Sequence, residues 1–328
     1  MIHPTRAGSE NNMLAVFYLI GIISGVAATT QASFNGEIRR RFRSPYITSV
    51  INFIVAVVII AVVLLIAEHS LAIPVSEIAK YPFWIWTGGV CGAIIVLTGI
   101  VCLPVLGSAR NMMLLCFGQI MGGLIIDHFG IFAAPVTKMT LMRTAGAVIE
   151  IVGIVLISYE KNEVGQSHDD RRQRVLLYIL VDILAGFVAA MQVAVNGTLN
   201  VVAGSPVKAT LVSMCGALIT ITVITCLIML LRGRMAIYDG YAPPEKPVKI
   251  SPFLLTGGSM ALVVVGGNAI TGPVLGTGVV TMMNLFGMMA SGLAVDATGF
   301  LGIEKKPVTL SKLLGMLLML IGTAMISL

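Results

Sequence analysis

Long apolar stretches recur along almost the whole chain, and they constrain its fold more than any other feature. An α-helix rises 1.5 Å per residue, so about 20 apolar residues cross the roughly 30 Å of hydrocarbon in a bilayer. We therefore expect a multi-pass membrane protein. The ten stretches cover residues 13–34, 46–67, 83–103, 107–126, 141–159, 175–195, 207–231, 252–270, 274–295 and 310–328.

The composition and the periodicity both favour helices in these stretches. The chain is 57% hydrophobic and only 11% charged, which is unusual for a water-soluble domain. The period-two alternation of a membrane barrel is absent, and a helix is the remaining way to pair every backbone group in lipid. The predicted fold class is an all-α integral membrane protein with ten transmembrane helices. The first stretch lacks a small-x-small cleavage site, so we expect it to be retained as a helix.

Several classes of chemistry have no support in the sequence. The five cysteines lie inside predicted helices without C-x-x-C spacing or histidine companions, which favours packing over metal binding. The signatures of P-loop ATPases, zinc metalloproteases and serine hydrolases are missing. The basic residues lie in short loops, where they more often set membrane orientation than bind nucleic acid. We therefore expect no enzyme, no cofactor, no metal and no nucleic-acid partner.

The chain contains an internal repeat. "QASFNGEIRRRFRSP" at residues 31–45 shares its Q-x-x-x-N-G and S-P frame with "QVAVNGTLNVVAGSP" at residues 192–206, a separation of 161 residues. Further along, "GGLIIDHFG" at 122–130 matches "SGLAVDATG" at 291–299, a separation of 169 residues. The extra residues fall in a longer loop of the second copy. Two related halves of five helices each are therefore predicted.

The predicted halves are residues 1–159 and 175–328, joined by a charged linker at 160–174. Because five is odd, the second half must enter the membrane from the opposite side to the first. The two copies are then related by an axis in the membrane plane, as in many secondary transporters. The sequence therefore predicts an inverted repeat.

The distribution of Lys and Arg predicts the orientation. The loops after the first, third, fifth, seventh and ninth stretches carry sixteen of these residues, whereas the opposite face carries five. Loops rich in Lys and Arg are usually cytoplasmic. We therefore expect a cytoplasmic (inner) membrane protein with both termini on the non-cytoplasmic side.

The repeated motifs resemble a known family. The frame G-x5-Q-x3-N-G followed by S-P, "GQIMGGLIIDHFG" at 118–130, and the glycines Gly146 and Gly153 are similar to the YdcZ-type family of the drug/metabolite transporter superfamily. Members are usually single five-helix units, and this chain resembles two such units fused. The resemblance implies an inner-membrane transporter fold with an exporter function and no assigned substrate. The second half departs from the pattern at Met288, where the first half has Gln119.

Polar side chains inside the apolar stretches are the first candidates for a substrate path, because they are costly in lipid and tend to face protein or water. Gln31 and Asn35 lie four residues apart on one helix face, and Gln192 and Asn196 repeat this spacing. Either each pair lines a shared cavity, or it caps a helix end at the Asn-Gly turn. We favour capping for the asparagines and cavity lining for the glutamines. Further cavity candidates are Gln119, Asn268 and Asn284.

Asp182 is a carboxylate about 10 Å into its predicted helix, where the first half has Gly21. One interpretation is a group that exchanges a proton with substrate or water, the minimum for proton-coupled export. The alternatives are a buried acid kept neutral by hydrogen bonds and an interfacial residue that reaches the basic linker.

Four further charged residues are interpreted as structural clamps. Asp127 and Asp296 end predicted helices, where the helix dipole disfavours a carboxylate unless it has a specific partner. Arg143 and Lys312 each follow by sixteen residues, which predicts a clamp in each half. Glu150 lies on nearly the same helix face as Arg143, which predicts either an intramembrane ion pair or a dimer contact.

The leading hypothesis is a secondary transporter that exports a small metabolite or drug-like molecule by alternating access, with a proton as one candidate coupling ion. Its partners would be that substrate and the lipid bilayer. The stretches at 141–159 and 310–328 are expected at the periphery, where they could form a homodimer. One rival is a membrane-embedded lipid-modifying enzyme, although the four histidines are scattered. The other is a channel or a scaffold without active transport.

Overall fold

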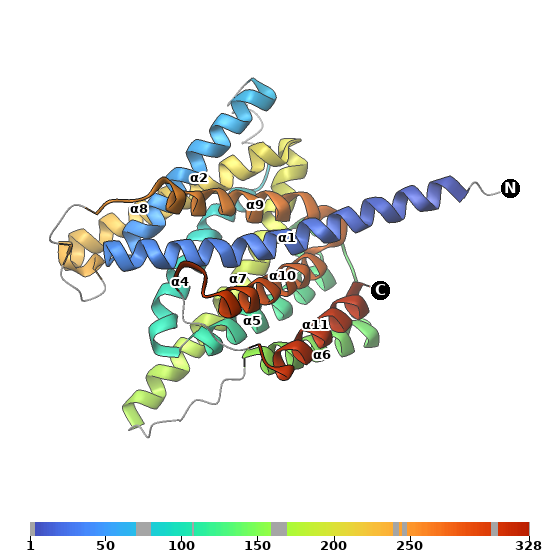
Figure 1. The fold of residues 1–328 in the computed structure, drawn as a ribbon. Coiled ribbons are helices and arrows are strands. Elements are labelled where there is room, and N and C mark those ends of the chain that lie inside the picture. The colour runs from blue at the N-terminus through green and yellow to red at the C-terminus, as the bar shows by residue number, and fades with distance from the viewer. Residues whose placement is uncertain are drawn as a thin grey trace.

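The computed structural model describes residues 4–69, 80–106, 108–158, 169–238, 243–244, 248–302 and 308–327. Ten long α-helices form one bundle over these residues, and Figure 1 shows them as labelled ribbons. Short 3-10 turns η1 (Phe83–Trp86), η2 (Ile131–Ala133), η3 (Arg234–Ile237) and η4 (Phe300–Gly302) occur between them. The helices are α1 (Pro4–Phe42), α2 (Pro45–Glu68), α4 (Gly88–Leu106), α5 (Ser108–Phe129), α6 (Leu141–Ser158), α7 (Asp169–Ala203), α8 (Pro206–Arg232), α9 (Pro252–Leu275), α10 (Thr277–Thr298) and α11 (Leu310–Ser327).

The all-helical architecture predicted from the apolar stretches is confirmed for the described residues. Seven helices are long and apolar enough there to cross a membrane: α1, α2, α7, α8, α9, α10 and α11. Gly88–Thr98 and Leu114–Phe129 are apolar but shorter. The full set of ten spans therefore stays a prediction. Of the charged linker predicted at 160–174, residues 160–168 lie outside the described part and the rest belongs to α7.

The predicted helix ends at the Asn-Gly pairs are wrong. Asn35 and Asn196 lie in helical backbone, and their helices continue to Phe42 and Ala203. These segments pack against helices of the other half, and packing of this kind outweighs a weak local preference for a turn. Asparagine capping is therefore not the reason for the repeated frame.

The Ser-Pro end of the frame marks the start of a new helix in both halves. The hydroxyl of Ser44 accepts a hydrogen bond from the amide of Ile47 at 3.2 Å, and that of Ser205 accepts one from the amide of Lys208 at 3.3 Å. Proline fits the next position because the first helical residue needs no amide donor. The frame therefore encodes the N-cap of α2 and of α8.

The first helix of each half packs against the fourth helix of the other half. On α1, a Cβ added to Gly25 would lie 2.0 Å from the carbonyl oxygen of Asn284 on α10. On α7, a Cβ added to Gly186 would lie 2.1 Å from the carbonyl oxygen of Leu115 on α5. The two contacts are equivalent in the repeat, because Gly25 corresponds to Gly186 and Asn284 corresponds to Leu115. Because the backbones touch, glycine is required at both places.

Equivalent helices of the two halves run in opposite directions where they meet. On the peripheral pair α6 and α11, Gly146 lies against Gly322 and Gly153 against Gly315, an antiparallel register. For α2 and α8, the hydroxyl of Ser44 donates to the carbonyl of Ile237 at one end, at 2.6 Å. At the other end, Glu68 pairs with Lys208 at 2.7 Å. The starts of α2 and α8 therefore lie at opposite ends of the bundle.

The variant Gly186→Ala tests the crossed packing. We expect it to lower the free energy of unfolding by about 1–3 kcal/mol, because the new methyl group would force α5 and α7 apart. The matched control is Gly292→Ala on α10, where a Cβ would meet nothing within 4 Å. The measurement is the thermal unfolding midpoint of the purified proteins in detergent. Equal midpoints for the two variants would contradict the proposed contact.

Candidate functional site

A central cavity of about 190 Å³ lies among the first four helices of each half. Residues of α1, α2, α4, α5, α7, α8, α9 and α10 line it, and none of the described lining residues comes from α6 or α11. Most of the lining is aliphatic. Five of the eight predicted cavity residues are among the polar groups that do line it: Gln31, Gln119, Gln192, Asn268 and Asn284.

Hydrogen bonds to neighbouring helices hold most of these amide side chains. The amide nitrogen of Gln31 donates to Asn52 on α2 at 3.3 Å, and that of Gln192 donates to the carbonyl of Gly88 on α4 at 3.0 Å. The amide nitrogen of Asn284 donates to the Oδ1 of Asn268 at 2.8 Å. The Oδ1 of Asn284 has no partner among the described residues. The cavity therefore offers neutral hydrogen-bonding groups that the protein itself orients.

Asn35 and Asn196 do not line the cavity. Asn196 is fully buried against Gly88, and neither its Oδ1 nor its Nδ2 has a partner within the described chain. Sequence reasoning missed Asn52, the partner of Gln31. The signal was present, because Asn52 is a polar residue inside an apolar stretch, the same criterion that selected Gln31.

Asp182 is fully buried on α7 and is not part of the cavity lining. Neither of its carboxylate oxygens has a hydrogen-bond partner in the described part of the chain. A charged carboxylate in such a place is very costly, so this environment favours the neutral acid.

Asp127 connects three helices at one end of the bundle. Its Oδ1 accepts a hydrogen bond from the amide of Thr277 and its Oδ2 accepts one from the amide of Gly278, each at 2.8 Å. The guanidinium of Arg143, at the start of α6, lies 3.7 Å from the same carboxylate. The carboxylate at the end of α5 therefore caps the start of α10, where free amides and the helix dipole favour an anion.

The sequence predicted the start of this helix at residue 274, three residues before Thr277, but it did not predict that Asp127 caps it. Gly276 has φ of 80° and interrupts the chain between α9 and α10, which exposes the amides of the next two residues. The signal was the tetrapeptide P-V-L-G, which stands at residues 104–107 and again at 273–276. A repeated Pro and Gly between two apolar stretches is typical of a break between helices.

Of the two alternatives predicted for Glu150, the ion pair with Arg143 is not formed, and the dimer contact stays a prediction. Arg143 donates through its Nε to the carbonyl of Ile326 at 3.0 Å and through its Nη1 to the carbonyl of Thr137 at 2.9 Å. The Oε1 of Glu150 accepts a hydrogen bond from Thr323 at 3.4 Å. Seven residues of helix separate the two groups by roughly 10 Å. Arg143 stands at the start of α6, and its side chain reaches the last turn of α11 and the loop before α6 instead.

The remaining predictions on charged groups and dimer formation are not tested. The side chain of Asp296 lies outside the described residues, so its predicted contact with Lys312 stays a prediction; Lys312 itself is buried at the start of α11. The glycine faces of α6 and α11 pack against each other within one chain. A homodimer through these two helices would have to use their outer faces. Among the described residues, no group of three or more His, Cys, Asp and Glu could hold a metal ion.

The variant Asp127→Asn tests the clamp. The amide can accept only through its single oxygen, so one buried backbone donor loses its partner and the charge of Arg143 loses its counterion. We expect the free energy of unfolding to fall by about 3–5 kcal/mol, measured by thermal unfolding in detergent. The double variant Asp127→Asn/Arg143→Gln should lose less than the sum of the two single variants. Strictly additive losses would contradict a coupled pair.

Comparisons with known proteins agree with this geometry. One solved crystal structure is similar over 94% of this chain and 94% of its own, with a TM-score of 0.63 and 13% sequence identity, which establishes a shared fold alone. No curated protein matches the chain. The model of the family described as "Putative inner membrane exporter, YdcZ" matches two segments, residues 16–156 and 177–325. The chain therefore belongs to the YdcZ family of inner membrane proteins, and the match covers most of both predicted halves.

Proposed function

We propose that the protein is a secondary transporter that exports a small neutral or weakly ionised molecule by alternating access. The observation that carries the proposal is the central cavity, which takes its polar groups from both halves and whose described lining residues carry no formal charge. An uncharged ligand fits amide donors and acceptors in an otherwise aliphatic cavity better than an ion does. Membership of the exporter family supports the same conclusion.

The two conformations would arise from an inverted repeat, with residues 1–159 and 175–328 as its halves. The antiparallel pairs α2 with α8 and α6 with α11 support this relation. The crossed packing of the first helices also supports it, because α1 packs on α10 of the second half and α7 packs on α5 of the first half. Two halves that swap their conformations give cavities open to opposite faces.

The proposed orientation places both termini on the non-cytoplasmic side. Arg41 at the end of α1 donates to the carbonyl of Lys249 near the start of α9, and Arg232 ends the neighbouring α8. These basic residues therefore gather at one end of the bundle. Lys208 lies at the other end, where Glu68 neutralises it. The positive-inside rule then makes the arginine-bearing end cytoplasmic.

Asp182 is the candidate for proton coupling. Its burial without a hydrogen-bonding partner among the described residues favours the neutral acid in this conformation. It lies on α7, one turn from Gly186, where α7 packs on α5. A relative movement of α5 and α7 during transport would change its surroundings and could release the proton.

The variant Gln119→Met tests the cavity as the binding site. Purified protein is first screened by thermal shift against neutral amino acids, nucleosides, sugars and weak amphipathic bases, and hits are assayed for saturable uptake into proteoliposomes. Methionine is what the repeat places at the equivalent position 288, so the cavity should keep its shape. Loss of one hydrogen bond should raise the KM roughly 2- to 10-fold.

The control for this variant is Leu184→Ala, which changes a 63% exposed side chain on α7 away from the cavity. Its KM should equal that of the wild type. A saturable flux whose KM neither variant alters would show that Gln119 is not part of the binding site and that the ligand binds elsewhere. Flux without saturation would support a channel instead.

The variant Asp182→Asn tests proton coupling. Asparagine has nearly the same shape but cannot release a proton, so uptake driven by a pH gradient should fall to the rate measured without a gradient. Exchange of labelled for unlabelled ligand at equal pH should persist. Glu150→Gln is the control, because it changes a buried carboxylate on peripheral α6 that does not line the cavity. Intact coupling in Asp182→Asn would exclude this residue from the mechanism.

A further inference from the structure

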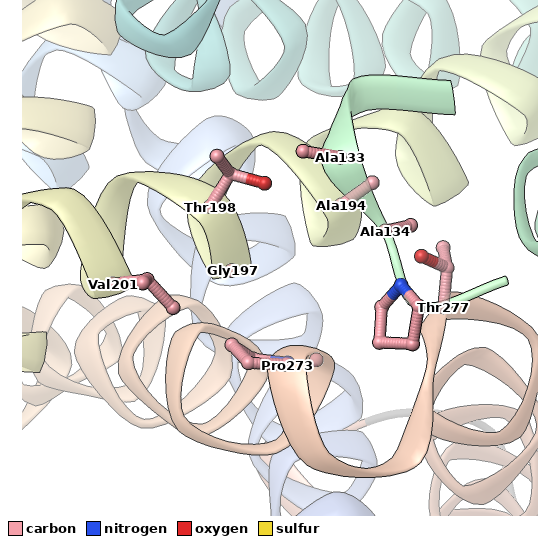
Figure 2. A pocket seen from close by; sticks show the side chains of 10 residues that line it. Ala133, Ala134, Ala194, Gly197, Thr198, Val201, Pro273 and Thr277 are labelled. Atoms are coloured by element: carbon pink, nitrogen blue, oxygen red, sulfur yellow. The ribbon is translucent and has the colours of Figure 1, made fainter. Parts of the chain in front are cut away.

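A second pocket, of about 250 Å³, lies next to the central cavity, and residues of α7, α9 and α10 line both spaces (Figure 2). Along α7, Val193 lines the central cavity and the next residue, Ala194, lines the second pocket. Along α9, Asn268 lines the cavity and Gly272, one helical turn later, lines the pocket. Figure 2 shows Thr277, from the start of α10, at the edge of the second pocket. The two spaces are therefore neighbours along the same three helices.

Three polar side chains of α10 form a row that runs from the second pocket to the central cavity. Thr277 lines the pocket and Asn284 lines the cavity, and Thr281 lies between them on the helix. Positions four and three residues apart share one helix face, and seven residues span roughly 10 Å. Thr277 and Thr281 are each 1% exposed, and Asn284 is 8% exposed. We call these three residues the polar row.

Each member of the polar row has a buried oxygen atom without a hydrogen-bond partner among the described residues. These atoms are the Oγ1 of Thr277, the Oγ1 of Thr281 and the Oδ1 of Asn284. A threonine inside a helix can satisfy its hydroxyl at the carbonyl four residues earlier, as Thr271 does at Gly267 on α9. Buried polar atoms that lack a protein partner usually bind ordered water, because leaving them unpaired is costly.

The helical fold does not require polar groups at these positions. The repeat places Ser108, Met112 and Leu115 at the equivalent positions of the first half, so only one of the three is polar there. The corresponding helix, α5, forms with these residues. Leu115 lines the central cavity, as Asn284 does. The complete polar row is therefore a property of the second half alone.

We propose that the polar row binds water molecules that connect the second pocket with the central cavity, and that a neutral ligand leaves the cavity along this route. Each unpaired oxygen accepts a hydrogen bond, so the hydroxyl or amide donors of a ligand can replace the water. The pocket lies near the end of α7, and Lys208 follows at the start of α8. Passage of a ligand rests on the proposed transport function, whereas the presence of water in the route does not.

Two neighbouring cysteine variants, Thr281→Cys and Met282→Cys, test the water route. Both are made in a background whose five native cysteines are replaced by alanine, and the purified proteins are placed in lipid nanodiscs. The two residues lie at the same depth in the bundle and are 1% and 0% exposed, so static burial predicts equal reactivity. Met282 belongs to an apolar cluster with Ile120 and Leu124 of α5. Only Thr281 belongs to the polar row.

The measurement is the rate of modification by a methanethiosulfonate reagent that carries a fixed charge. Such a reagent needs a thiolate in contact with water, and an apolar environment suppresses the thiolate. We expect Thr281→Cys to react roughly tenfold faster than Met282→Cys, or more. Equal rates for the two variants, whether both are fast or both are slow, would overturn the proposal.

Thr281→Val in the native chain is a second test, which does not depend on the cysteine-free background. Valine has nearly the same shape but no hydroxyl. If the hydroxyl binds water, its loss should lower the thermal unfolding midpoint by about 2 °C. If the hydroxyl is packed without any partner, valine removes an unfavourable group and the midpoint should rise. A midpoint that rises or stays the same would contradict bound water at this position.

The modified Thr281→Cys protein tests passage of the ligand. The bulky adduct should obstruct the route, so saturable uptake should fall while the thermal shift that the ligand causes at the cavity persists. Unchanged uptake after complete modification would exclude this route for the ligand. Fast modification without saturable uptake of any ligand would refute transport and leave the water route standing. Saturable uptake by a Thr281→Cys protein that does not react would refute the route and leave transport standing.

Discussion

Backbone contact between helices at glycine is the interaction on which the rest of the structure depends. In lipid the hydrophobic effect does not drive helices together, so close packing has to supply much of the association energy. Gly25 against Gly287 and Gly186 against Gly118 bring the first helix of each half onto the fourth helix of the other. The two halves are thereby interlocked, and the glycine-lined pair α6 and α11 joins them a second time at the periphery.

The cavity follows from this interlocked arrangement. With α1 and α7 each drawn to the opposite half, Gln31 and Gln192 line the same cavity, and α9 and α10 bring Asn268 and Asn284 to it. Hydrogen bonds to neighbouring helices hold these amides, so neutral groups supply the polar part of the lining that the structure describes. Asp127 ties the start of α10 to the end of α5 at one side of the same bundle.

Much of this arrangement could be predicted from particular residues. Polar side chains in apolar stretches identified five residues of the cavity, and an acid at the wrong end of a helix dipole predicted a specific partner for Asp127. The errors occurred where tertiary contacts override local preference. Asn35 and Asn196 continue a helix because that part of the helix is packed against the other half. Arg143 bonds the carbonyl of Ile326 in the last turn of α11 and that of Thr137 in the loop before α6, and not Glu150.

The sequence by itself determined the helical class, the family and the repeated motifs, because apolar length, the lack of alternation and identical residues at constant spacing are properties of the chain alone. The tertiary structure alone decided that the first helix of each half packs on the fourth helix of the other half. It also decided that Asp127 accepts hydrogen bonds from the amides at the start of α10. The same holds for Gly197, which packs against Pro273 of another helix of the same half. These features are relations between distant segments, and the spacing of motifs along the chain does not specify which segments meet in space.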